Sequence, residues 1–194
     1  MEKQSENGSR ARNALYQQRP APDEGSIIKR QWFQYYNPRE YKIEGKRVNF
    51  YFDTAYTEKE KNDPTAGIAY VKEGANFYIL ECTAEWLDFS GQIQLVKDFT
   101  ARNGYSPSSI IRVEPKATGI SLVQEKKKET GLNVTEGKPP KGDKVARAHS
   151  CEGTLEGGRV YLPDGMTWVG PFLDECAAFP NAAHDDRVDC LTGM

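Results

Sequence analysis

The segment RVNFYFDTAYT, residues 47–57, carries the clearest structural signal in the chain. Val48, Phe50 and Phe52 alternate with more polar residues, and a period of two in strong β-formers predicts a strand. The predicted strand ends at Asp53. A carboxylate at the end of so apolar a strand is costly to desolvate unless it has a partner, so the sequence raises the question of what Asp53 pairs with.

The residues that follow predict a mixed β-sheet. TAGIAYVKEG (65–74) and ANFYILECTAEW (75–86) are strand-like runs joined by a turn around Gly74, so three successive antiparallel strands form a predicted meander. Strand-like and helix-like segments then alternate. We expect strands at 109–115, 132–137 and 160–165, and helices at 88–104, 118–131, 143–158, 167–179 and from 185 onward. A meander followed by βα units is typical of an α/β domain whose mixed sheet is flanked by helices.

Composition limits the classes of function. The 194 residues fit one domain with room for an appended segment, and no apolar run reaches the length of about 18 residues that a membrane span needs. The N-terminal residues lack signal-peptide character. A net charge of −2 argues against nucleic-acid binding by overall charge, but this objection weakens if several acids bind cations.

The metal-ligating residue types point to oxygen ligands. The four cysteines have no CxxC spacing, which favours reduced thiols in a cytosolic protein over a zinc or redox site. Two histidines exclude a histidine-rich metal site. Any metal would therefore be bound mainly through oxygen, which suits magnesium, calcium or manganese.

A second acid closes a second apolar strand. Glu114 ends the predicted strand SIIRVEP (109–115), and Pro115 directly after it stops the strand ladder. Open α/β sheets bind their ligands outside the carboxyl ends of the strands. Glu114 and Asp53 are therefore candidates for one shared site.

The third acidic element is HDDRVD, residues 184–189, which falls where a helix is predicted to begin. In such a helix Asp185 and Asp189 share a face at positions i and i+4, and Asp186 and Asp189 are neighbours at i and i+3. Two strand ends and the start of one helix would then bring their carboxylates to one point. Two divalent ions roughly 4 Å apart, held by such carboxylates, can activate water and stabilise the leaving oxygen of a phosphodiester.

Other interpretations of each acid stay open at this point. The helix macrodipole stabilises acids in the first turn of any helix. Asp189 could pair with Arg187 or with a lysine elsewhere. Asp53 could cap the loop after its strand through an Asx-turn.

At these residues the sequence resembles the C-terminal nuclease domain of the large terminase subunit of tailed bacteriophages, which has an RNase H-like fold. The matching stretches cover most of the chain in the same order: ALYQQRPAPDEGSIIKRQWF (14–33), FYFDTAYTEKEKNDPTAG (50–67), VEPKATG (113–119), DKVARA (143–148), GGRVYLP (157–163) and HDDRVD (184–189).

The resemblance implies a two-metal site for Mg²⁺ or Mn²⁺. Its ligands would be Asp53, Glu114 and an aspartate of the HDDRVD segment. We expect Asp186 to be the principal third ligand, with Asp185 and Asp189 adjacent to it.

Other residues of the matching stretches become candidates for substrate contact. We expect His184 either to support the ligands or to lie near the scissile phosphate. Lys116, just after Glu114, and Lys144 and Arg147, on the DKVARA segment, could contact the DNA backbone. Each of these cations could equally be an ordinary surface charge.

The resemblance also implies a domain organisation. Residues 1–25 are expected to be the tail of an ATPase domain with its linker, and residues 26–194 the RNase H-like nuclease domain. The sequence has no GxxxxGK[ST] phosphate loop, so we expect no motor activity from it.

The function implied is a metal-dependent endonuclease that cuts double-stranded viral DNA concatemers during genome packaging. It would act in the host cytoplasm of a phage-infected or prophage-carrying bacterium. The expected partners are double-stranded DNA, the terminase ATPase domain, the small terminase subunit and the portal, with no membrane. The alternatives are an RNase H-like resolvase or exonuclease, and a non-catalytic module for interactions within the packaging machinery.

Overall fold

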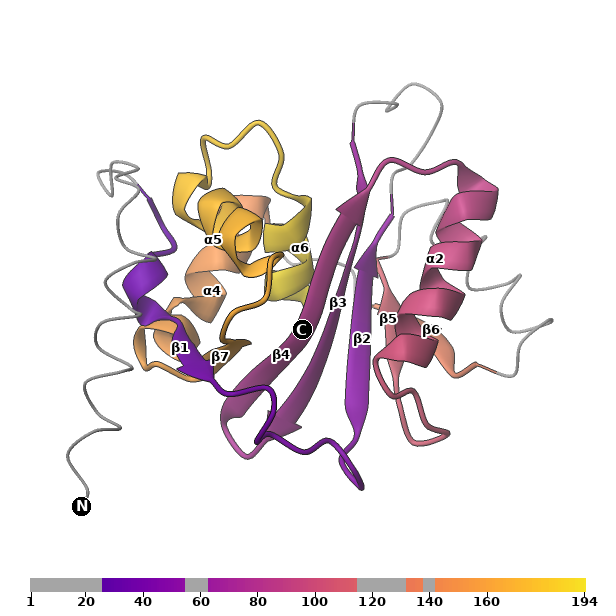
Figure 1. The fold of residues 1–194 in the computed structure, drawn as a ribbon. Coiled ribbons are helices and arrows are strands. Elements are labelled where there is room, and N and C mark those ends of the chain that lie inside the picture. Colours follow the sequence, from indigo (N-terminus) through magenta and orange to yellow (C-terminus); the bar gives the residue numbers. More distant parts are fainter. Residues whose placement is uncertain (1–25, 55–62, 115–131, 138–141) are drawn as a thin grey trace, which may run out of the picture.

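The computed structural model of the protein describes residues 26–54, 63–114, 132–137 and 142–194. In these residues a seven-stranded mixed sheet carries helices on both of its faces (Figure 1). The strand order is β1-β7-β4-β3-β2-β5-β6. The elements in chain order are η1 (Arg30–Trp32), β1 (Gln34–Tyr36), β2 (Val48–Asp53), β3 (Thr65–Glu73), β4 (Asn76–Glu85), α2 (Phe89–Arg102), β5 (Ile111–Val113), β6 (Val134–Glu136), α4 (Lys144–Glu156), β7 (Val160–Pro163), α5 (Val169–Ala178) and α6 (Asp186–Gly193).

The predicted mixed sheet is confirmed. Strands β2, β3 and β4 form the expected antiparallel meander, and Gly74 takes a positive φ of 59° in the turn between β3 and β4. Strand β5 pairs with β2 and with β6 in parallel, and β7 pairs in parallel with β4 and β1. Asp53 is the last residue of β2, as its sequence pattern predicts.

The expected helices after the meander are present wherever the structure describes the chain. Helix α2 starts after Asp88, whose side chain accepts a hydrogen bond from the Gly91 amide at 2.7 Å, and ends just before Gly104. The expected helix at 118–131 and the expected linker at 1–25 lie outside the described residues. Among the helices that are described, none is long and apolar enough to cross a membrane.

One strand was not expected from the sequence. The region around residues 27–38 is rich in β-formers, but only the short β1 forms there, after the 3-10 helix η1. Strand β1 pairs along its whole length with the distant strand β7, with Tyr35 opposite Leu162. A pairing partner so far along the chain leaves no local signal in the sequence.

The alternation of β2 divides the interior into two cores. Phe50 and Phe52 are fully buried against Phe99 of α2 on one face of the sheet. Tyr51 belongs to the core on the opposite face, where α4, α5 and α6 gather (Figure 1). Asp53 shares that second face because side chains alternate along a strand. The pattern that builds the aromatic core thus directs the carboxylate toward the three helices.

Gly67 in β3 lies directly opposite Phe52, and a Cβ atom at this position would come within 2.6 Å of the phenyl ring. We expect Gly67→Ala to lower the free energy of unfolding by about 1–3 kcal/mol, because the ring must shift inside a filled core. Urea unfolding measures the change.

The matched control is Gly170→Ala in α5, where an added Cβ meets no atom of the described residues within 4 Å. This variant should be as stable as the parent or more stable, because alanine is favoured over glycine in helices by about 1 kcal/mol. Equal stability of the two variants would contradict the close approach of Gly67 to Phe52.

Candidate metal centre

Three buried carboxylates meet at one end of the sheet. Asp53, Glu114 and Asp189 each offer an oxygen, and these oxygens lie within 4.8 Å of one another. The residues are only 1%, 4% and 3% exposed, respectively. Two of them are placed by neighbouring parallel strands, since Phe52 is opposite Val113 and the Glu114 amide donates to the Phe52 carbonyl at 2.9 Å. The third comes from helix α6.

The third acid of this triplet is Asp189, where the resemblance led us to expect Asp186. Asp186 is the first residue of α6, about 4.5 Å along the helix axis from Asp189. Burial and, to a smaller extent, the negative charges of Glu175, Asp63 and Asp185 together raise the pKa of Asp186 to about 6. The acids that act on Asp186 are thus different from the two strand acids. A ligand role for Asp186 or Asp185 stays a prediction.

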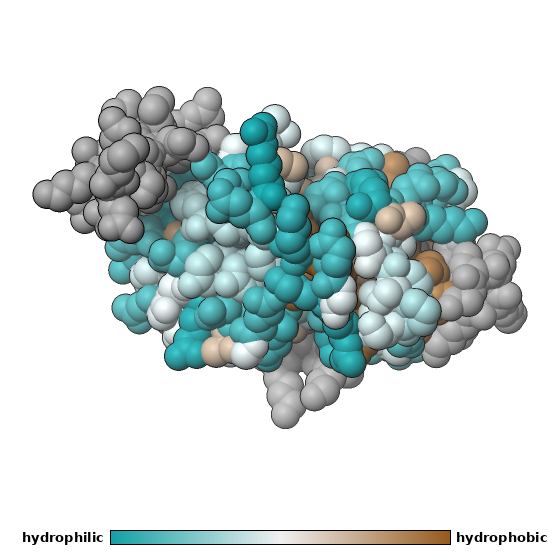
Figure 2. Space-filling model, turned by 60° about the horizontal axis from the view of Figure 1, so that its bottom comes forward, coloured by the Kyte–Doolittle hydropathy of each residue, from teal (hydrophilic) through white to brown (hydrophobic). Residues whose placement is uncertain are grey.

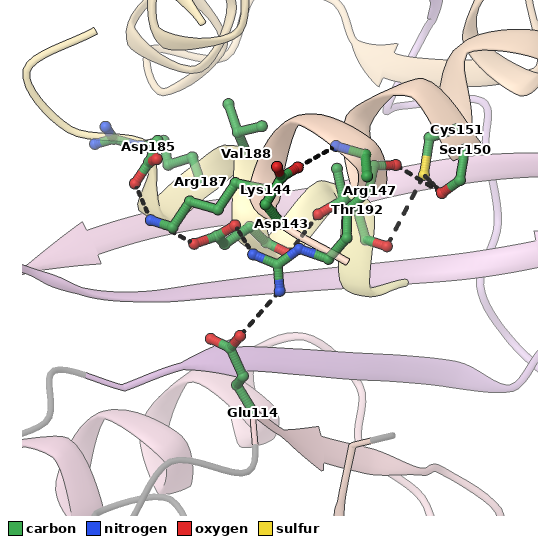
Figure 3. A network of polar contacts seen from close by, with 12 residues as sticks. Glu114, Asp143, Lys144, Arg147, Ser150, Cys151, Asp185, Arg187, Val188 and Thr192 are labelled. Atoms are coloured by element: carbon green, nitrogen blue, oxygen red, sulfur yellow. Dashed lines mark hydrogen bonds and ion pairs between the residues drawn. The ribbon is translucent and has the colours of Figure 1, made fainter. Parts of the chain in front are cut away.

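Helix α4 supplies positive charge to the acids. Arg147 donates to Glu114 Oε1 at 3.1 Å and to Asp189 Oδ1 at 2.6 Å, so its guanidinium links the strand acid to the helix acid (Figure 3). Lys144 contacts Asp185 Oδ1 at 2.5 Å and Asp189 Oδ2 at 3.0 Å. Burial raises the pKa of Asp189, and the two cations oppose that rise without cancelling it. These contacts with Arg147 and Lys144 lower the repulsion between the carboxylates of Glu114, Asp185 and Asp189.

A residue that the sequence analysis missed holds helix α6 in place. Glu175 of α5 is 9% exposed, and one of its carboxylate oxygens accepts hydrogen bonds from the amides of Arg187 at 2.6 Å and Val188 at 3.3 Å. Its other oxygen accepts from the Arg187 guanidinium at 2.7 Å. The first amides of a helix have no partner within the helix, so this carboxylate caps α6. Its one signal in the sequence is an acid within the mostly apolar run TWVGPFLDECAAF.

Arg187 therefore pairs with Glu175, and not with Asp189 as one open interpretation had it. His184 is not a member of the triplet. Its ring contacts Trp86 edge-on with centroids 5.7 Å apart, and its Nδ1 lies 3.9 Å from Asp63.

The structure does not test whether Lys116, Lys144 and Arg147 contact DNA. Lys144 and Arg147 lie beside the acids, as described above. Lys116 lies outside the described residues. A role for these three cations, or for His184, in binding DNA or the scissile phosphate stays a prediction.

The donor set suits a hard divalent cation. All three converging groups are carboxylates, and oxygen ligands are those that magnesium and manganese prefer. Because the carboxylates are buried, a bound cation would offset the cost of their crowding. Asp53, Glu114 and Asp189 are thus the residues that would hold Mg²⁺ or Mn²⁺.

Comparison with protein families assigns the chain. Residues 50–193 match the family model described as the terminase RNaseH-like domain, a span that contains all three acids. The chain belongs to this terminase family. This confirms the resemblance and the RNase H-like fold class that the sequence motifs indicated. No curated protein sequence matches the chain significantly.

The terminase RNase H-like domain is also similar in fold to solved nuclease domains of low sequence identity. The large terminase nuclease from thermophilic phage G20c with bound magnesium gives a TM-score of 0.63 at 16% identity, covering 89% of this chain and 96% of that one. The human cytomegalovirus terminase nuclease domain gives 0.61 at 13% identity, covering 85% and 92%. The nuclease domain of the SPP1 phage large terminase with bound Mn gives 0.55 at 11% identity, covering 85% and 96%.

Metal binding should stabilise the fold through the triplet. An ion that binds only the folded state adds about 2.7 kcal/mol when its concentration is 100 times its dissociation constant. We expect millimolar manganese to raise the melting temperature of the parent. Asp53→Asn, Glu114→Gln and Asp189→Asn should each lose most of that rise, in thermal unfolding followed by circular dichroism.

The control for this series is Glu156→Gln, an exposed acid at the end of α4, which should keep the full rise. Asp186→Asn decides between the neighbouring aspartates of α6. We expect it to lose less of the rise than Asp189→Asn, and the opposite order would make Asp186 the principal third ligand.

Arg147 should compete with a metal for the same oxygens. Its side chain is 15% exposed and contacts acids whose side chains are 5% and 3% exposed, so its removal leaves buried negative charge. Loss of one partner of a buried ion pair costs about 3–5 kcal/mol. We expect Arg147→Gln to lower the melting temperature without metal and to increase the rise caused by manganese.

Arg159→Gln is the matched control, because Arg159 is an exposed arginine just beyond α4. It should leave both quantities unchanged. If Arg147→Gln melts at the parent temperature without metal, the guanidinium does not neutralise the acids.

Proposed function

We propose that this chain is a metal-dependent endonuclease domain that cuts double-stranded viral DNA during genome packaging. The observation that carries the proposal is the buried triplet of Asp53, Glu114 and Asp189 in a member of the terminase RNase H-like family. The proposal needs both the buried acids and the family membership, because a fold by itself is compatible with many functions.

The chain's own residues would set the geometry of the reaction. Asp53 and Glu114 come from the ends of paired strands, so the sheet fixes the spacing of their carboxylates. Asp189 closes the site from α6, whose first turn is held by Glu175. When bound, two divalent ions would supply a Lewis acid for the phosphodiester and lower the pKa of the attacking water.

The cations of α4 have a second role in this proposal. Arg147 and Lys144 offset part of the negative charge of the acids through the contacts described above. If a metal takes over that role, the same two side chains, which lie beside the acids, would be released to meet the negative charge of a DNA backbone.

The packaging context is part of the proposal. The cut would be made on DNA concatemers in the cytoplasm of the infected host. The ATPase domain, the small terminase subunit and the portal would be the partners that bring DNA to the site. Tethering to those partners raises the local concentration of DNA, so the isolated domain is expected to bind DNA weakly.

Supercoiled plasmid incubated with manganese tests the activity. We expect nicked and then linear products from the parent, and no detectable product from Asp53→Asn, because the variant keeps the side-chain shape but loses the ligand charge. Agarose electrophoresis measures the products, and Glu156→Gln serves as the active control.

Other products would identify another function. Loss of linear DNA from its ends, with supercoiled plasmid intact, would indicate an exonuclease. Selective cutting of a four-way junction would indicate a resolvase. Intact DNA in every case would indicate a non-catalytic module.

A further inference from the structure

A basic pocket lies on the same face of the sheet as the acids, toward the opposite end of β2. Its volume is about 460 Å³, and its polar lining includes Arg47, Asn49, Tyr70, Lys72 and Arg112. Gly74, Ile110 and Met194 complete the lining. Figure 2 brings this end of the molecule forward and shows hydrophilic residues over its centre.

Strand register brings the cations of the pocket together. Asn49 is opposite Tyr70, and Tyr51 is opposite Arg112, so these side chains share one face of β2, β3 and β5. Beyond the last pair of β2 and β3, Arg47 and Lys72 occupy the next opposing positions and line the same pocket. Two like charges placed opposite each other on neighbouring strands destabilise a sheet.

The positive side chains of this pocket are not balanced by acidic side chains of its described lining. That lining contains three cationic side chains and no carboxylate side chain, and Met194 contributes a main-chain oxygen that accepts a hydrogen bond from the Tyr70 hydroxyl at 3.4 Å. The neighbouring acid Glu73 is paired elsewhere, with Lys46 at 2.6 Å. Arg112 donates to the Tyr70 hydroxyl at 3.4 Å, a neutral partner that leaves its charge in place. Lys72 Nζ lies 4.9 Å from the centroid of the Phe77 ring, which is another neutral partner. An anion is the ligand that would offset the positive charges of this pocket.

The pocket is aligned with the candidate metal centre. Arg112 precedes Glu114 by two residues on the same side of the chain, about 7 Å away, and Asn49 precedes Asp53 by four, about 13 Å away. Each strand of duplex DNA carries one phosphate per 3.4 Å of helix axis. Successive phosphates of one strand are farther apart than this axial spacing because the backbone winds around the axis, so both separations span only a few nucleotides of one DNA backbone.

We infer that the pocket of Arg47, Lys72 and Arg112 binds a backbone phosphate of the nucleic-acid substrate a few nucleotides from the bond that is cut. The inference rests on the proposed function, since it names how that site holds its DNA. Contacts to phosphate position a duplex without reading its bases. The pocket therefore sets where the backbone lies relative to the acids and adds affinity that is independent of sequence.

Binding of a fluorescent 20-base-pair duplex in calcium, in the Asp53→Asn background, tests the inference without cleavage. Arg47→Gln, Lys72→Gln and Arg112→Gln should each weaken binding for every duplex sequence. Each should also reduce the slope of log affinity against log salt by about 0.9, the value for one lost phosphate contact. Lys97→Gln is the control, because Lys97 lies on α2 at the opposite face of the sheet, and it should change neither quantity.

Folding is checked by the melting temperature of each variant. Lys72→Gln removes one of two opposing like charges and also the contact of Lys72 Nζ with the Phe77 ring, so it should melt close to the parent temperature while binding DNA less well. Unchanged affinity and slope in all three variants would overturn the inference. It would also be overturned if the variants lost stabilisation by inorganic phosphate but bound the duplex as the parent does, because the pocket would then serve a small anion.

The plasmid assay separates this inference from the proposed function. If plasmid is cut and the three variants bind DNA normally, the nuclease proposal stands and the pocket inference fails. If plasmid stays intact but the variants lose affinity, the pocket inference stands and the nuclease proposal fails.

Discussion

Three carboxylates buried at one point need positive charge close by, and much of this structure is arranged around that need. Burial, with a smaller contribution from the charge of Asp185, raises the pKa of Asp189, and the cations of α4 lower it only in part. The strands fix two of the acids rigidly, so the helices must bring both the third acid and the charges that balance the group. This explains why α4 and α6 pack together on the face of the sheet that carries Asp53.

Helix α6 is held at both of its ends, and this fixes Asp189 between them. At the first turn, Glu175 accepts hydrogen bonds from two helix amides. At the last turn, Gly193 packs so closely on Tyr51 that a Cβ atom there would lie 2.2 Å from the ring. The placement of the acid therefore depends on a buried carboxylate and on a glycine, neither of which is a candidate ligand.

Local signals in the sequence were sufficient for much of the fold. The period of two in β2 and the pattern of the helix expected at 88–104 act within a few residues, so both could be predicted. The strand-end positions of Asp53 and Glu114 follow from the same patterns. Strand β1 could not be predicted, because its pairing with β7 is its main support. The choice between Asp186 and Asp189 depends on how α6 docks on Glu175, a contact between two elements that no sequence period encodes.

The acids of the triplet are widely spaced along the chain, and this has a consequence for synthesis on the ribosome. Asp53 emerges early, and Asp189 emerges only after β5, α4 and α5. Domains generally fold as units while the chain is being made. A nascent chain that has not reached α6 holds two of the three acids and has no complete metal site. If the triplet is the catalytic centre, partly made chains are harmless to the DNA around them, and nuclease activity begins only with the finished fold.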